Sequence, residues 1–397
     1  MIVFVIGAWR VRLVFGCPVV RSRGRIRMIT ASKGGDMKMR VSNSGGAAGW
    51  LFAKSIGIAA SAALATAHSA YAGSIGANTG TYAGDVAGIE FPVGTVAVTN
   101  YFGYRHQSTL YDTGGASSYA SFNVLTGTTR VDWRAADVFG RPLGVSFAGN
   151  YVNPRDVTIA GTDNSAVTTW FAPTVYVTLG LIADASHERD LAFTNYVIFG
   201  AGKYDSTKFV NVATPGQTVD VVQLTYQEGL RKFSPALKNF WFDAFGGIAF
   251  HSDGKNPITL GVDPVLGPIG FSKTTQSNSY DINAYIRYAW SELGFVALGL
   301  EKSWGGEQRA VGGLGELLNP AGPGSLSLSK DDYLKGHLQF GIPLGDRMQL
   351  AADLTHDFQR IGGFKESFTA EFRLLMLFAP AGTDDKPADT GNKTRKF

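Results

Sequence analysis

The chain has 397 residues, of which 45% are hydrophobic and 17% are charged, with 50 glycines and a single cysteine. After residue 72 no window offers the roughly 20 unbroken apolar residues of a membrane helix, which excludes a helical membrane protein. The formal net charge of +4 does not indicate a nucleic-acid partner, because the first 72 residues hold ten of the 36 Lys/Arg and only one of the 32 Asp/Glu.

Residues 1–72 have the organisation of a secretory signal region. A cationic lead-in precedes an apolar, alanine-rich stretch, and Ala70-Tyr71-Ala72 supplies an A-x-A site for cleavage between Ala72 and Gly73. A buried core helix is the alternative interpretation. The long lead-in leaves open that residues 1–36 are untranslated upstream sequence, with Met37 or Met39 as the true start.

Cleavage at this site would leave a mildly acidic chain without its only cysteine, Cys17. An exported chain without cysteine has no disulfides, no thiol catalysis and no lipid-anchor cysteine. The next segment, residues 73–92, is rich in glycine and has no periodic pattern. It is either an unstructured lead or a short plug that enters the lumen of a barrel.

Residues 93–378 predict an all-β fold with about 12 strands and no internal domain boundary. Side chains of a strand alternate between the two faces of a sheet, so alternating apolar and polar residues indicate strands with one apolar and one polar face. The predicted strands lie near 94–106, 118–133, 142–152, 169–183, 190–201, 217–229, 237–251, 278–290, 294–304, 332–342, 346–358 and 364–378.

The second of these strands changes phase between its two ends. Phe122 and Val124 are in one phase, whereas Val131 and Trp133 are in the other. A β-bulge or a kink between the two pairs would account for the change.

The last three predicted strands show the alternation most clearly. In the final one, Phe368, Phe372 and Phe378 share a face with no polar atom, and the connector Pro343-Leu344-Gly345 is short enough to demand antiparallel neighbours. Along the chain, long and short connectors alternate until the last, residues 359–363, which is short where a long one is expected.

This combination predicts an antiparallel transmembrane β-barrel with long extracellular loops and short periplasmic turns. A sheet that crosses hydrocarbon must close on itself, because every backbone N–H and C=O needs a partner. Aromatic side chains near the predicted strand ends suit the two membrane interfaces; these are Trp133, Trp170, Trp241, Trp290, Trp304 and Phe378. A secreted soluble β-protein, with the aromatics in its core, is the alternative.

Residues 379–397 are polar and rich in Pro and Gly, which indicates a periplasmic tail after a barrel that ends at Phe378. We therefore expect the barrel-assembly machinery to recognise the strand that ends at Phe378. Outer-membrane lipid and a small hydrophobic solute are the other expected partners, and no nucleic acid is expected.

No motif in the sequence predicts an enzyme. Gly144, Ser146 and Ala148 come near the G-x-S-x-G motif but lie inside a predicted strand, not at a strand-to-helix turn. The sequence contains no H-E-x-x-H motif, and no cysteine is available as a zinc ligand. We therefore expect no catalytic residue, no metal site and no cofactor.

The polar faces of the strands are the best functional candidates, since in a barrel they line the lumen. Opposite charges on neighbouring strands can pair there, either to fill the interior or to shape a selective pathway. The candidates are Asp281, Asn283, Arg287, Lys335, His337, Gln339, Arg347, Gln349, Asp353, Asp357, Glu371 and Arg373.

Several short segments resemble the meta-pathway phenol-degradation family, outer-membrane channels related to the long-chain fatty-acid channels. They are Gly84-Asp85-Val86-Ala87-Gly88, Pro92-Val93-Gly94-Thr95, Tyr101-Phe102-Gly103-Tyr104, Leu110-Tyr111-Asp112-Thr113-Gly114-Gly115 and Arg130-Val131-Asp132-Trp133. Phe199-Gly200-Ala201-Gly202-Lys203-Tyr204-Asp205 stands where the family has a Pro-Thr-Gly-x-Tyr-Asp turn, without its Pro and Thr.

The resemblance implies passive passage of hydrophobic, often aromatic, small molecules across the outer membrane of a Gram-negative bacterium, without enzyme activity. Two alternatives remain open from the sequence. The charged inner face would suit a general diffusion porin for polar solutes, and the long loops would suit a structural or adhesive barrel.

Overall fold

The computed structural model describes residues 82–83, 91–159, 161–184, 188–205, 216–255, 257–263, 267–291, 293–317, 324–330 and 332–380. All of them belong to the unit Trp50–Phe397. The predicted signal region with its Ala72–Gly73 cleavage site lies outside the described residues, as do most of residues 73–92 and of the predicted tail 379–397.

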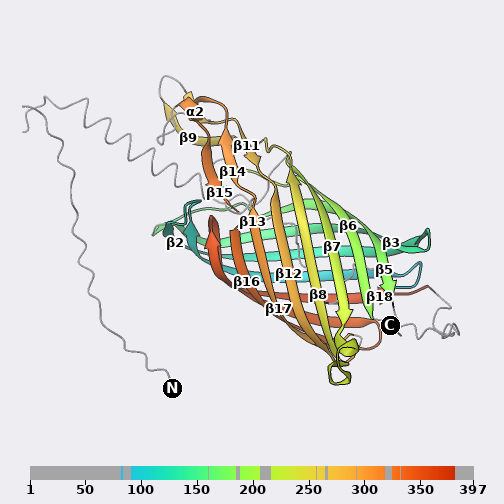
Figure 1. The fold of residues 1–397 in the computed structure, drawn as a ribbon. Helices are drawn as coiled ribbons and strands as arrows, with labels where there is room; N and C mark the ends of the chain where they lie inside the picture. The colour runs from blue at the N-terminus through green and yellow to red at the C-terminus, as the bar shows by residue number, and fades with distance from the viewer. Residues whose placement is uncertain are drawn as a thin grey trace, which may run out of the picture. The chain divides into compact units, whose positions relative to one another are not determined.

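Twelve antiparallel strands close into a barrel (Figure 1). Each strand pairs with the next along the chain, and the ring closes where the first strand pairs with the last, from Val96–Phe378 to Tyr111–Gly363. The barrel strands are β1 (Val96–Tyr111), β2 (Ser117–Val138), β3 (Arg141–Ile159), β5 (Thr169–Asp184), β6 (Arg189–Phe199), β7 (Thr218–Gly229), β8 (Phe240–His251), β12 (Ser279–Ala289), β13 (Phe295–Gly305), β16 (Asp332–Pro343), β17 (Met348–Ile361) and β18 (Gly363–Phe378).

The remaining elements lie in the connectors. β4 (Thr162–Asp163) folds back and pairs antiparallel with the end of β3, while β9 (Ile258–Asp263) pairs with β10 (Gly267–Phe271). A small sheet of β11 (Lys273–Gln276), β14 (Gln308–Val311) and β15 (Leu326–Ser329) joins two long connectors. It lies beyond one end of the barrel (Figure 1). Among the described residues, the helical segments are α2 (Leu314–Leu317) and two 3₁₀ segments, Leu230–Lys232 and Pro235–Leu237.

The apolar face of each strand points outward, away from the barrel interior. Phe372 is 51% exposed, Leu298 65% and Leu350 40%, and they belong to an exposed series that includes Phe102, Ile282, Ile286, Phe368 and Phe378. A soluble barrel would bury these side chains. An apolar outer surface on a closed sheet is the arrangement that lipid requires, because hydrocarbon solvates apolar side chains and the ring gives every barrel strand a paired neighbour on each side.

Most of the predicted interfacial aromatics are outside the barrel, but Trp241 is not. Trp133, Trp170, Trp290, Trp304 and Phe378 are exposed. Trp241 shares the inward face of β8 with the buried Asp243, and the Arg287 guanidinium lies 5.1 Å from the centre of its ring. The interfacial assignment of Trp241 is therefore wrong, because its cation partner holds it in the interior.

The phase change in β2 is not caused by a bulge. The pairing of β1 with β2 continues without a register shift from Arg105–Val124 to Val98–Val131. Phe122 and Val124 are buried on the inner face, whereas Val131 and Trp133 are exposed on the outer face. The apolar side chains of β2 therefore lie on the outer face at one end of the strand and on the inner face at the other. This is expected where a strand extends beyond the lipid, because its outer face then meets water while its inner face is shielded by the barrel.

The connectors follow the predicted alternation with two exceptions at one rim. Residues 200–217, 252–278 and 306–331 form long loops at that rim, whereas residues 112–116 and Gly362 are short turns there. The first connector is shorter than predicted because β1 and β2 stay paired to Tyr111–Ser117. Both short turns fall on neighbouring hairpins, and Gly362 N donates to Asp112 O at 3.0 Å.

An arginine on the outer face should destabilise the barrel. Phe372→Arg is expected to lower the free energy of unfolding in lipid vesicles by about 2–4 kcal/mol, the cost of an arginine facing lipid near the bilayer midplane. Urea titration followed by tryptophan fluorescence measures it. Asp346→Arg, in the exposed turn between β16 and β17, is the control, and an equal loss in both variants would contradict the assignment.

Candidate functional site

The inward faces of β13, β16 and β17 bring together a charged cluster around His337. The His337 ring lies 2.9 Å from the Asp353 carboxylate through Nδ1 and 2.9 Å from the Glu301 carboxylate through Nε2. Tyr333 donates to Glu301 at 2.5 Å and Gln339 donates to Asp353 at 3.1 Å. Because every side chain of this cluster is buried, with that of His337 only 8% exposed, these groups neutralise and solvate one another in place of water.

A second cluster surrounds Lys335, nearer the outer rim. Its ammonium lies 3.0 Å from the Glu366 carboxylate and 4.0 Å from Asp357. Arg105 lies 3.2 Å from Glu366, and Arg360 lies 3.5 Å from Asp357. Cations and carboxylates alternate across β16, β17, β18 and β1, so this part of the wall is tied together from the inside.

On the adjoining strands β12 and β8, Arg287 forms a two-pronged pair with Asp243. The two contacts are 2.8 and 3.2 Å, and Asp243 is fully buried. Four and six residues before Arg287, on the same inward face of β12, Asn283 donates to Asp281 at 3.0 Å, and both are buried. A bidentate arginine–carboxylate pair fixes both position and orientation.

Tyr82 and Ala83, which precede the first strand, lie inside the barrel. Ala83 N donates to the Gln339 side chain at 2.8 Å, and the Tyr82 hydroxyl donates to the Glu371 carbonyl at 3.3 Å. The Arg373 guanidinium lies 4.2 Å from the centre of the Tyr82 ring. Gln349 accepts from Arg373 at 2.5 Å and so holds it in place.

An aromatic cluster surrounds Tyr82 and reaches across the interior. It contains buried side chains from β1, β8, β12, β13 and β17, namely Tyr101, Phe245, Tyr285, Phe295, Ala297 and Ala351. Gly299 and Gly341 give two of these rings their space, because a Cβ at either position would collide with Tyr285 or Phe295. The rings can therefore lie against the wall and leave room for Tyr82.

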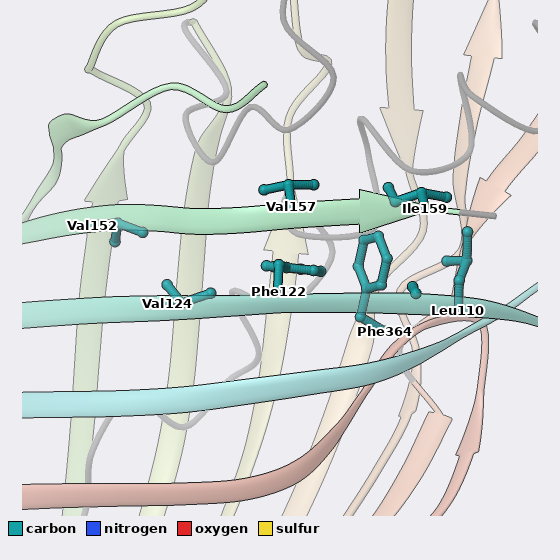
Figure 2. Close-up of a cluster of buried hydrophobic side chains, with 8 residues drawn as sticks. Leu110, Phe122, Val124, Val152, Val157, Ile159 and Phe364 are labelled. Atoms are coloured by element: carbon teal, nitrogen blue, oxygen red, sulfur yellow. The ribbon is translucent and has the colours of Figure 1, made fainter. Parts of the chain in front are cut away.

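Toward the outer rim the inner face becomes apolar. Figure 2 shows Leu110, Phe122, Val124, Val152, Val157, Ile159 and Phe364 gathered on the neighbouring strands β18, β1, β2 and β3. The rings of Phe122 and Phe364 meet edge to face at 4.6 Å. The interior thus has an apolar outer part above a polar, charged part.

Eleven of the twelve predicted lumen residues lie on inward strand faces. Asp281, Asn283, Lys335, Gln339, Gln349, Asp353, Asp357 and Arg373 are buried, and Arg287, His337 and Glu371 are partly buried. Arg347 differs, because it is exposed in the turn before β17 begins at Met348. The strand prediction from residue 346 started too early, so Arg347 lies at the rim.

Several residues that complete these clusters are not among the twelve predicted lumen residues. Glu301 shares the inward face of β13 with Ser303, and the alternation of the predicted strand 294–304 could have identified it. Glu366 was hidden by irregular pairing, because the β1–β18 register shifts between His106–Phe368 and Gln107–Glu366. Arg105 precedes this shift, so the alternation of the predicted strand 94–106 could have identified it. Tyr82 and Ala83 carried no local signal, because their partners are distant in the sequence. The Tyr82 hydroxyl bonds to a residue 289 positions away, and Ala83 N bonds to one 256 positions away.

No group of three or more His, Cys, Asp or Glu side chains within the described ranges could hold a metal ion. In the same ranges, no helix is both long and apolar enough to span a bilayer.

No protein-family model matches the chain, and no curated protein matches it in sequence. Among solved structures, an outer membrane channel from Pseudomonas putida has 18% identity and a TM-score of 0.60, over 75% of this chain and 100% of that chain. The NanC porin (8% identity, 71% and 100% covered, TM-score 0.36) and a mutant of the TodX monoaromatic hydrocarbon channel (7%, 74% and 91%, 0.39) are more distant.

The likeness to the Pseudomonas putida channel shows the fold. Together with the closed ring and its apolar outer belt, it places the chain among the outer-membrane β-barrels of Gram-negative bacteria.

Removing His337 should destabilise the interior. His337→Ala would leave the Asp353 and Glu301 carboxylates buried without the ring between them, and breaking a buried charge pair costs about 3–5 kcal/mol. Unfolding in lipid vesicles measures the loss. Lys273→Ala removes an exposed pair with Asp253 and should cost under about 1 kcal/mol. A His337→Ala barrel as stable as this control would rule out the cluster as a structural element.

Proposed function

We propose that this protein is an outer-membrane channel for the passive uptake of small hydrophobic or aromatic compounds. The observation that carries the proposal is the position of Tyr82 and Ala83, which lie inside the barrel among aromatic side chains from opposite walls. A lumen filled in this way suits a channel that opens for a bound apolar solute better than a permanently open pore. No residue is assigned a covalent role.

The pairing of the interior charges supports the same conclusion. Lys335, His337 and Arg287 each face carboxylates at hydrogen-bonding distance. Charges that are already paired and desolvated offer little attraction to a passing ion. A ring of twelve strands also encloses a lumen between that of packed eight-stranded barrels and that of open 16-stranded porins.

We further propose that the segment 73–92 acts as the plug of this channel, of which Tyr82 and Ala83 are the seated part. Outer-membrane lipid is the proposed partner of the apolar belt, and the assembly machinery is the proposed partner of the strand that ends at Phe378. The resemblance of segments such as Arg130-Val131-Asp132-Trp133 to the meta-pathway phenol-degradation family supports aromatic solutes as the substrate class.

Two measurements separate this proposal from a general diffusion porin and from an adhesive barrel. In planar bilayers, the purified protein should give little steady ion current. In a Gram-negative host, its expression should speed the uptake of the apolar dye N-phenyl-1-naphthylamine, followed by fluorescence. A large steady current would favour the porin, and unchanged dye uptake would overturn the proposal.

Removing the seated tyrosine should open the lumen. Tyr82→Ala deletes the ring that lies against Tyr101 and Arg373, so water and ions gain a path and the single-channel conductance should rise severalfold. Tyr119→Ala removes a tyrosine that is 62% exposed and should leave the conductance unchanged. Equal conductance in Tyr82→Ala and the wild type would show that this residue does not obstruct ion passage.

A further inference from the structure

The lipid-facing wall of the barrel is hollowed on one side. An apolar groove of about 640 Å³ crosses the outward faces of the strands from β8 to β18, and its lining includes Ala284, Leu300, Gly336, Phe358 and Phe368. This volume lies within the range of about 300–1,000 Å³ that is typical of small-molecule pockets. A hollow of this kind can hold one hydrocarbon chain in a fixed position, because the chain contacts side chains on several of its sides.

Two small residues make the groove. The strand register places Ala284, Leu300 and Gly336 side by side on the neighbouring strands β12, β13 and β16. Leu300 therefore stands between two positions that carry little or no side chain. A Cβ at Gly336 would lie 2.7 Å from the Phe358 ring, so a glycine is what allows this ring to lean over the groove.

Aromatic residues on the same part of the wall show the depth of the groove in the membrane. Tyr280 and Trp304 are stacked beside the long connectors, with ring centres 5.7 Å apart, and Phe240 meets Tyr288 edge to face at 5.2 Å toward the periplasmic end. Such aromatic girdles mark the two membrane interfaces, with an apolar band about 25 Å tall between them. Ala284 is midway between Tyr280 and Tyr288 on β12, so the groove lies within the apolar band.

A pair of lysines stands between the groove and the outer interface. Lys302 lies on the outward face of β13, two positions after Leu300 and two before Trp304. Its ammonium is 2.6 Å from the Asp332 carboxylate, and Lys330 reaches the same carboxylate at 3.2 Å. Asp332 thus holds two ammonium groups side by side and neutralises only one of them. The two lysine side chains are 41% and 34% exposed, so both can meet a further anion.

The groove and the lysine pair together have the polarity of an acyl lipid with an anionic headgroup. Lysine side chains near a membrane surface lay their hydrocarbon stems along apolar surface and place the ammonium at the level of the headgroups. A hydrocarbon chain in the groove would therefore end beside Lys302, where a phosphate would meet both ammonium groups. Inorganic phosphate would leave the groove unused, and an uncharged lipid would leave the lysines unused.

We propose that this side of the barrel is a binding site for a phosphate-bearing acyl lipid of the outer leaflet. One acyl chain lies in the groove beside Gly336, and the phosphate binds Lys302 and Lys330. The inference does not rest on the proposed function, because it concerns the lipid-facing wall and not the solute. Lys330 belongs to the long connector 306–331, so the bound phosphate also ties this loop to the membrane surface.

Native mass spectrometry of the folded barrel in detergent micelles, with added diphosphoryl lipid A, tests the phosphate site. The wild type should retain bound lipid A. Lys302→Ala/Lys330→Ala should bind it about tenfold more weakly, because two cations near the headgroup are lost. Arg141→Ala/Lys238→Ala is the matched control, because it removes two exposed cations from the periplasmic rim and should leave the affinity unchanged.

A second variant tests the groove and leaves the charges in place. Gly336→Val would push the Phe358 ring aside and fill the hollow, so lipid A should bind severalfold more weakly. Gly246→Val is the matched control on β8, because the nearest atom to a Cβ at Gly246 is the Asp281 carbonyl oxygen at 3.8 Å, an ordinary contact. The heat-dependent mobility of the barrel in electrophoresis identifies the folded protein in each variant.

The outcomes separate the parts of the proposal. Equal affinity for lipid A in the wild type and in Lys302→Ala/Lys330→Ala would overturn the phosphate site, and so would equal binding of dephosphorylated lipid A by the wild type. Equal losses in the two cation pairs would also overturn it, because the effect would then be one of net charge. Wild-type affinity in folded Gly336→Val would overturn the placement of the acyl chain. None of these outcomes depends on dye uptake, so the proposed channel is tested separately.

Discussion

Backbone hydrogen bonding in hydrocarbon is the constraint on which the rest of this structure depends. A strand in lipid has no water to bond its N–H and C=O groups, so each strand needs a partner on both edges. The ring satisfies this need by pairing β1 with β18, the two ends of the barrel sequence. Closure then fixes which face is outside, and the apolar side chains must occupy it.

The same closure creates an interior that is cut off from bulk water, where a lone charge would be costly. The barrel meets this cost by pairing charges across strands, as His337 does with Asp353 and Glu301. Tyr82 adds an aromatic centre that contacts opposite walls.

The sequence by itself determined the barrel strands and their faces. Alternation with a period of two is a local property, so twelve predicted ranges match the twelve strands of the ring. Eleven of the twelve predicted polar residues lie on inward faces, because the face of a residue follows from its parity along a strand. Strand ends were less certain, and Arg347 fell into a turn for that reason.

Only the tertiary structure decided which inward groups meet. Asp243 and Arg287 are 44 residues apart, and Arg105 and Glu366 are 261 apart, and no local pattern encodes such pairings. It also decided that Trp241 faces Arg287, that the apolar face of β2 changes sides and that Tyr82 lies inside the barrel. These features depend on the curvature of the closed ring and on where its strands leave lipid, which are properties of the assembled sheet.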